Sequence, residues 1–458
     1  MKSLLLSPAF LAVFFLLGTL AEARIGSRFP SEKKIVTDPV TSVPLTFLTS
    51  TPAGDSKIYQ THRQWTADSK WLVFRSNRVR GQAMAVNEET GVMVQVTEHG
   101  YSGMLCLAAH SMKLYFLRTQ EARPVAAVTG AEPAYGAAPS AATAHGPSQI
   151  IEVDLEKLFA DSEAATLRDA DVYERVCGTI PLDWGAGGDM ALDADERIAY
   201  FRVGHDEAAK HLPAGTKIEA NFGPRKMGAG PTGLARMDLH TGEVKFIVAV
   251  PFQIGHVQAN PFVPGEIVFC WETGGKSPQR TWTVQADGTG LRPLYPEAPY
   301  EWVTHEAVIS RDEVALAILG HRQPGVNDEW GPCGTREKPT GLGIVNLRTR
   351  EMRIAGQTKS GSGLWHVNGS ADGRWAVGDD FDRSLYLIDR KTDELILLSA
   401  GHKATAADHP HPTFSPDGTR IEIQSAMLSE NNRSMNICVI PVPETWLKRT
   451  YSAKPATP

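Results

Sequence analysis

The sequence has few cysteines and no excess of positive charge. Its 46 Lys and Arg residues are outnumbered by 52 Asp and Glu residues, which gives a net charge of -6 at pH 7. Proteins that hold nucleic acid through general basicity need the opposite balance, so no nucleic-acid partner is expected. The five cysteines include no CxxC pair. We therefore expect at most one disulfide and no thiol chemistry.

Long apolar runs are also missing after the N-terminal segment. The one such run, residues 4–20, is followed by Ala21-Glu22-Ala23, the small-residue pattern of a signal peptidase site. A membrane anchor is the alternative, but the run is slightly short for a span and ends in a clean cleavage site. We expect residues 1–23 to be a signal peptide. The mature protein would then be periplasmic or secreted, with no membrane attachment.

Glycine and proline are plentiful, at 41 and 30 residues, which favours many short strands joined by turns. A short turn followed by an apolar strand recurs seven times, at residues 66–74, 110–116, 193–201, 263–269, 310–316, 371–377 and 415–421. Several copies are followed by a second hairpin. Two hairpins make one four-stranded antiparallel sheet, so the sequence predicts an all-β, seven-bladed β-propeller that forms a single domain over residues 24–458.

Four segments depart from this repeat. Residues 36–45 resemble the outer hairpin of a blade without its inner strands, and we expect them to close the ring by pairing with the final blade. Residues 122–148 are rich in Ala, Pro and Gly and predict a flexible excursion. Residues 156–175 favour a short helix, and residues 320–339 predict a long polar loop.

Histidines near the starts of the later repeats carry the clearest chemical signal. In an extended strand, residues two apart point to one side, so His409 and His411 can present two imidazoles to one point. His305 and His366 precede similar turns in neighbouring repeats. If the fold brings them together, the group suits a borderline divalent cation. Each could instead be a structural, hydrogen-bonded histidine, and the residues alone leave both readings open.

Several motifs in one order resemble the oligogalacturonate lyases. They are residues 254–257, 279–284, 303–306, 366–379, 407–414 and 439–446. The resemblance covers most of the mature chain. It implies a seven-bladed propeller that uses a divalent metal, typically Mn²⁺, and cleaves short oligogalacturonides by β-elimination. The chain would then be a carbon-oxygen lyase acting on polysaccharides.

The same resemblance implies roles for single residues. His366, His409 and His411 match the metal ligands of the family, His305 its catalytic base, and Arg280 an arginine that contacts substrate. A glutamine ligand of the family falls on Ala406 here. Either water or Asp408 would complete the coordination, or the metal would bind weakly or be a different ion.

The reaction explains why these residue types are needed. The C5 proton of a uronate is acidic only when the adjacent carboxylate is neutralised, which a cation and an arginine can do. A neutral histidine can then remove the proton. We expect Tyr59 and Arg63, which precede the first inner strand, and His256 to line the substrate site.

Two other functions stay open. One is an exported lyase for another uronate, such as glucuronan or an ulvan-like polymer. The other is a non-catalytic TolB-like propeller that binds glycan or protein. A hydrolase is disfavoured because no well-placed carboxylate pair stands out in the sequence.

Overall fold

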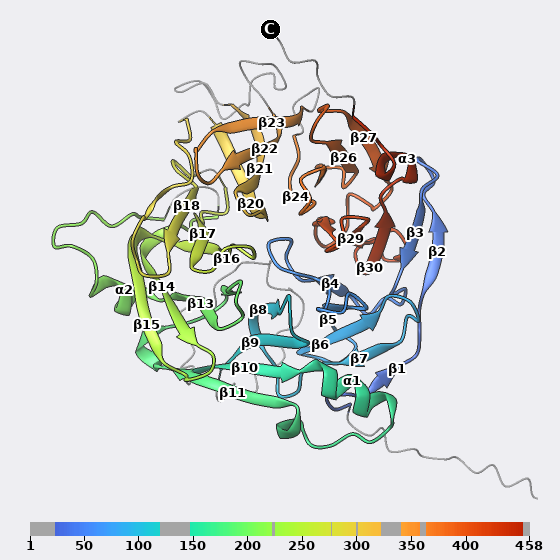
Figure 1. The fold of residues 1–458 in the computed structure, drawn as a ribbon, viewed down its shortest axis with the longest axis horizontal. Helices are drawn as coiled ribbons and strands as arrows, with labels where there is room; N and C mark the ends of the chain where they lie inside the picture. The colour runs from blue at the N-terminus through green and yellow to red at the C-terminus, as the bar shows by residue number, and fades with distance from the viewer. Residues whose placement is uncertain are drawn as a thin grey trace, which may run out of the picture.

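The computed structural model describes residues 23–119, 147–221, 225–275, 277–298, 301–321, 340–357 and 363–451. Seven antiparallel sheets surround a central axis, with β4, β8, β16, β20 and β24 among the strands nearest to it (Figure 1). This confirms the predicted seven-bladed propeller. The expected signal peptide, the excursion after residue 122 and the loop after residue 320 fall wholly or mostly outside the described residues.

The strands of the first four blades run outward from the axis in chain order. Blade 1 holds β4 (Asp55–Lys57), β5 (Trp71–Ser76), β6 (Gln82–Asn87) and β7 (Met93–Gln95), and β1 (Arg28–Phe29) pairs outside β7. Blade 2 holds β8 (Ser102–Leu107), β9 (Lys113–Thr119), β10 (Ser148–Asp154) and β11 (Glu174–Ile180). Blade 3 holds β12 (Met190–Leu192), β13 (Ile198–Val203), β14 (Ala229–Asp238) and β15 (Val244–Phe252), and blade 4 holds β16 (Ile254–Ala259), β17 (Glu266–Trp271), β18 (Thr281–Gln285) and β19 (Arg292–Pro293).

The last three blades follow the same plan. Blade 5 holds β20 (Glu301–Ser310), β21 (Glu313–His321), β22 (Gly341–Asn346) and β23 (Met352–Gln357). Blade 6 holds β24 (Val367–Gly369), β25 (Trp375–Asp379), β26 (Leu385–Asp389) and β27 (Leu395–Ser399). Blade 7 holds β28 (Thr413–Phe414), β29 (Arg420–Ser425) and β30 (Asn436–Pro441), and β3 (Pro44–Phe47) and β2 (Lys34–Thr37) complete it. Each of the seven predicted turns joins the first and second strands of a blade.

The N-terminal hairpin closes the ring as predicted. β3 pairs with β30 in the register Thr46↔Val439 and Phe47↔Cys438, so the final blade contains strands from both ends of the chain. Asp38 strengthens this seam, because its carboxylate accepts hydrogen bonds from the Ser399 hydroxyl and the Ala400 amide of blade 6.

The core lies between the blades. Phe116 and Phe201 fill the space between blades 2 and 3, and Trp375 and Ile423 fill the space between blades 6 and 7. Burial of a large apolar side chain contributes about 1.5–3 kcal/mol. The aromatic residues of the repeats therefore serve mainly to pack blade on blade.

Three short helices complete the described residues: α1 (Leu155–Glu163), α2 (His205–Ala209) and α3 (Glu444–Leu447). Helix α1 lies in the segment where a short helix was expected. It begins at Asp154, whose side chain accepts a hydrogen bond from the Lys157 amide. None of the described helices is long and apolar enough to cross a membrane.

The cysteines behave as small apolar residues. The four that the structure describes are free and buried: Cys106, Cys177, Cys270 and Cys438. Burial raises the pKa of each of these thiols. Since the thiolate is the reactive form, the raised pKa keeps these four thiols protonated and unreactive at neutral pH.

Candidate active site and metal centre

Histidines from successive blades meet at one level of the channel. In four blades a histidine stands four residues before the residue whose amide closes the inner turn, and the turn-closing residues are Thr66, Asn260, Ser370 and Ser415. These histidines are His62, His256, His366 and His411. His305 of blade 5 joins the same row, because its ring lies 6.1 Å from that of His256 and 4.2 Å from that of His366.

Three of these histidines adopt a backbone conformation that L-residues usually avoid. The φ angles of His256, His305 and His411 are 49°, 50° and 51°. At His256 and His305 the strand pairing shifts register, which marks a β-bulge. A left-handed residue costs about 1–2 kcal/mol, and bulges re-aim side chains beside active sites. The fold therefore holds the backbone of these three histidines in a strained conformation, which sets the orientation of their imidazole side chains.

His366, His409 and His411 lie together around Asp379. The His366 and His411 rings stack with their centroids 3.6 Å apart, and the His409 ring lies 5.3 Å from that of His366. The Asp379 carboxylate accepts hydrogen bonds from the His366 amide, at 2.6 Å, and from the His411 amide, at 3.3 Å. It also lies 3.2 Å from His366 Nδ1.

Charge stabilises this cluster. Burial alone would raise the pKa of Asp379, but the facing His366 and His409 hold it well below its usual range. Burial, together with the neighbouring His411, lowers the pKa of His366 to about 3. His366 is therefore neutral near pH 7, which is the form of imidazole that binds metals.

Asp408 lies beside the histidine cluster. Its Oδ2 lies 3.0 Å from His411 Nε2, and the other ring nitrogen of His411 lies 2.9 Å from Gln60 Oε1. Ala406, by contrast, is buried against Ala426 and Met435 in a small apolar cluster. The fold therefore places Asp408, and not Ala406, next to one of the predicted metal ligands.

Gln424 fixes the loop that carries His409 and His411. Its side chain donates to the His409 carbonyl at 2.8 Å and to Asp408 Oδ2 at 3.2 Å, and its amide donates to the Pro410 carbonyl. Its Oε1 accepts from the Lys57 amide of blade 1. One buried glutamine therefore ties the histidine loop across the seam of the ring.

His305 lies between the metal-binding candidates and a second polar group. The Trp365 ring lies 4.5 Å from its ring, and the Thr304 hydroxyl lies 3.2 Å from its Nδ1. Burial and the charges of His366 and Arg280 lower its pKa well below the usual value. In the tautomer whose Nδ1–H donates to the Thr304 hydroxyl, Nε2 of the neutral imidazole is the nitrogen that can accept a proton.

Arg280 is enclosed by carboxylates and is not open to a ligand. Its side chain is 2% exposed, its Nε donates to Glu306 at 3.1 Å, and its Nη2 lies 3.4 Å from Glu272. His256 joins the same group, with Nδ1 3.0 Å from Glu306. The substrate contact predicted for Arg280 would therefore need these ion pairs to loosen.

Opposite charges set the protonation of this network. Burial alone would raise the pKa of Glu306, but the charges of Arg280 and His256 lower it to about 2. Burial alone would lower the pKa of His256, but Glu306 raises it. His256, Glu272 and Cys270 have spacing that would suit a metal, yet the nearby Arg280 charge and the buried Cys270 thiol make the group unfavourable for a cation.

The two predicted substrate contacts in blade 1 have different surroundings. The Tyr59 ring lies 5.0 Å from the rings of both His256 and His411, so it spans the histidine row. Arg63 instead donates to the carbonyls of Trp65 and Thr66 in its own turn, away from the row. His62 bonds through Nε2 to the Met190 carbonyl of blade 3.

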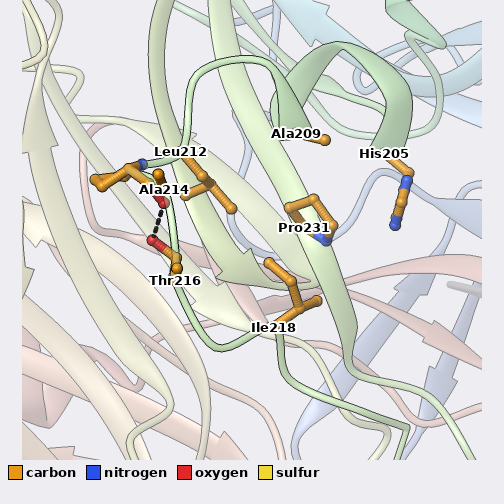
Figure 2. A pocket seen from close by; sticks show the side chains of 9 residues that line it. His205, Ala209, Leu212, Ala214, Thr216, Ile218 and Pro231 are labelled. Atoms are coloured by element: carbon orange, nitrogen blue, oxygen red, sulfur yellow. Dashed lines mark hydrogen bonds between the residues drawn. The ribbon is translucent and has the colours of Figure 1, made fainter.

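A separate hollow lies outside the histidine row. Its volume is about 330 Å³, and α2, the following loop and Pro231 of β14 line it (Figure 2). The lining is mostly apolar and includes none of the predicted site residues. It therefore contributes nothing to the site described above.

Sequence comparisons identify relatives of one kind. No protein-family model matches the sequence. The oligogalacturonide lyase of Pectobacterium atrosepticum is 24% identical over 213 residues, which cover 41% of this chain and 50% of that protein. The oligogalacturonate lyase of Dickeya dadantii is 25% identical over 282 residues, covering 56% and 66%. The chain thus spans about half to two thirds of the length of the curated relatives it matches.

Solved structures agree with the architecture. An oligogalacturonate lyase in complex with manganese aligns with a TM-score of 0.67 and 19% identity, covering 93% of this chain and 100% of that one. An oligogalacturonate lyase from Vibrio parahaemolyticus gives the same score and identity, covering 92% and 100%. At this identity the likeness shows the fold.

The fold and the channel together define a class, a seven-bladed propeller with a histidine-lined site at its axis. Within that class, the chain is similar in sequence to the two curated oligogalacturonide and oligogalacturonate lyases, and it shares the fold of the solved oligogalacturonate lyase structures.

Replacement of Arg280 by Met tests whether its role is structural. The change leaves Glu306 and Glu272 without their main cation, and breaking a buried pair costs about 3–5 kcal/mol of unfolding free energy. Because the pKa of Glu306 is lowered to about 2, its contribution to stability is complete above pH 4.5 and is lost as the pH falls towards 2. In the variant, the pKa of Glu306 in the folded protein moves back towards 4.5, so the loss of stability between pH 4.5 and 2 should become smaller.

Denaturant unfolding measures this effect. Arg353→Met is the matched control, because Arg353 and Asp393 form an exposed pair that is worth less than about 1 kcal/mol. An Arg280→Met protein as stable as the control variant would contradict the structural role.

Proposed function

We propose that this chain is a metal-assisted lyase that cleaves short uronate oligosaccharides, most directly oligogalacturonides, by β-elimination. One observation carries the proposal. His305, which is half-buried, lies beside His366 in a cluster with His409 and His411, and His366, Asp379 and His409 are close enough together to share a cation. A base next to a cation site is the arrangement that removal of a proton adjacent to a carboxylate requires. The lyase names of the related proteins support the same reaction class.

The residues present fit a divalent cation. His409 Nδ1 is buried, lies 3.6 Å from Asp379, and has no hydrogen-bond partner among the described residues. Asp379 is hydrogen-bonded to His366 Nδ1, which leaves Nε2 as the ligand atom and matches the carboxylate–histidine–metal pattern of metal sites. His366 and His409, whose donor atoms lie within 4.8 Å of each other and of Asp379, would hold the ion. His411 would join them by giving up the contact of its Nε2 with Asp408, which would also release Asp408 as an oxygen donor. Mn²⁺ is the ion proposed, as in the related manganese complex.

When bound, the cation would neutralise the substrate carboxylate and so acidify the C5 proton. His305 accepts that proton through the ring nitrogen that does not face Thr304. The electrons of the C5–H bond form the C4–C5 double bond as the C4–O4 bond breaks, and the leaving oxygen takes a proton from solvent. Glu306 raises the pKa of His256, which favours the protonated ring that would attract the uronate carboxylate, and Tyr59 borders the same space.

Replacement of His305 by Gln should lower kcat for digalacturonate by about 10²- to 10⁴-fold, the usual contribution of a general base. The bound manganese should stay at the level of the unmodified protein, because His305 is not among the ligands. Turnover is followed by the ultraviolet absorbance of the 4,5-unsaturated product, and manganese by elemental analysis. Retained turnover would remove His305 from the base role.

Replacement of either His409 or His411 by Ala should remove manganese and activity together. Each change deletes one of three imidazole ligands, and metal affinity depends on ligand number. His240→Ala, at an exposed turn outside the histidine row, should keep both. Full manganese content in both cluster variants would refute the metal site. Manganese binding with no product from galacturonate, glucuronate or ulvan-type oligomers would favour the binding propeller.

We also propose that residues 1–23 direct export. The predicted cut after Ala23 falls just before the first packed residue, Ile25, which is fully buried beside blades 1 and 2 and whose amide donates to Glu98. The mass of the protein recovered outside the cytoplasm should correspond to a chain that begins at Arg24. A recovered chain that retains residues 1–23, or one found only in the cytoplasm, would contradict export.

A further inference from the structure

Beside the histidine row, an aromatic pair leads from the buried site to solvent. The Trp365 ring lies 4.5 Å from the His305 ring and 5.8 Å from the His409 ring. The Phe381 ring lies 5.1 Å from Trp365 and 6.3 Å from His409. Trp365 thus borders the base and a metal-binding candidate, and Phe381 extends this surface outward.

Phe381 is an unusual residue to find exposed. It is 43% exposed, although aromatic side chains of this size are normally buried. It lies in the connection between β25 and β26, and this connection is held in shape: the Asp380 side chain accepts from the Ser384 amide, and the Asp380 carbonyl accepts from the Arg383 amide. The exposed ring is therefore presented by an ordered turn.

A cation accompanies the aromatic pair. Arg383 donates through Nε to the Asp408 carbonyl at 3.2 Å and through Nη1 to the Phe381 carbonyl at 3.3 Å. Both acceptors are main-chain oxygens, and among the described residues no carboxylate lies within the 4.0 Å of an ion pair with Arg383. The guanidinium lies beside the main chain of Phe381 and Asp408, next to the histidine cluster.

We infer that Trp365, Phe381 and Arg383 form a subsite for a second uronate ring, next to the one that is cleaved. The inference rests on the proposed function and deepens it. The apolar face of a pyranose ring packs on an aromatic side chain, which supplies contact area with little loss of conformational freedom. The carboxylate of the same ring pairs with the guanidinium, which suits planar carboxylates. A neutral sugar or an apolar peptide would leave the arginine unused.

The subsite predicts a preference for longer substrates. The exposed Asp382 in the same turn would oppose an anionic ring, so the aromatic surface has to contribute much of the binding. Loss of one aromatic contact is expected to weaken binding of trigalacturonate by about five- to tenfold. Binding of monogalacturonate, which reaches only the inner position, should change little.

Calorimetric titration of the manganese-loaded His305→Gln protein separates binding from turnover. Adding Phe381→Ala or Arg383→Gln should weaken trigalacturonate and leave monogalacturonate within twofold, whereas Phe381→Tyr should restore the affinity. Phe262→Ala is the matched control, because Phe262 is 39% exposed in the β16–β17 turn, at the opposite end of the blades. Equal affinities of all variants for trigalacturonate would overturn the subsite.

The same titrations distinguish failure of the subsite from failure of the proposed function. If the protein with Phe381 and Arg383 intact binds no galacturonate of any length, the proposed substrate is wrong. If it binds trigalacturonate but Phe381→Ala weakens the binding of galacturonates of every length equally, the proposed substrate class is supported and the second-ring subsite is refuted. Because Phe381 is a surface residue, its replacement should leave the denaturant midpoint of unfolding unchanged.

Discussion

The pairing of β3 with β30 holds the candidate site together. The site draws on blades 4 to 7 and on blade 1, so it crosses the seam where the two ends of the chain meet. Tyr59 and Gln60 contact His411 only because that seam is closed. Gln424 and the Lys57 amide add a direct link across it. In this propeller the closure of the ring and the assembly of the site are therefore one event.

Two buried carboxylates organise the polar interior in different ways. Asp379 faces the imidazoles of His366 and His409 and two main-chain amides, with no cation paired to it among the described residues. Glu306 faces Arg280 and His256, so the Arg280 guanidinium balances its charge. The low dielectric of the interior strengthens both arrangements. Adjacent parts of the site thus differ in electrostatics: one carboxylate is surrounded by imidazoles, and the other belongs to an ion-pair network with Arg280.

The sequence predicted the architecture well because the propeller signal is local. Each turn and its apolar strand lie within about ten residues, and the closing hairpin is equally local. The histidine row was also predictable, since its members precede the same kind of turn. Asp379 lies in the motif at residues 366–379, but its contact with His366 depends on the register in which β24 pairs with β25.

Other parts of the site depend on contacts between blades, which no local pattern records. Gln60 lies 351 residues from His411 and Gln424 lies 15 residues from His409, the histidines that they contact. No sequence motif around either glutamine identifies it as part of the site. Arg280 matches a family position, but its enclosure by Glu272 and Glu306 follows from the packing of blade 4 on blade 5. The Arg63 side chain hydrogen-bonds within its own turn because the carbonyls of Trp65 and Thr66 lie within reach.

The order in which the chain is made gives the closing hairpin a further meaning. Residues 34–47 are made before the strands of blades 1 to 6, but their partner β30 spans Asn436–Pro441 and is made after those strands. The first hairpin therefore cannot pair until blades 1 to 6 have been made, and His409 and His411 also follow those blades in the chain. A cation held by His409 and His411, as proposed, could not serve as a template for the early blades.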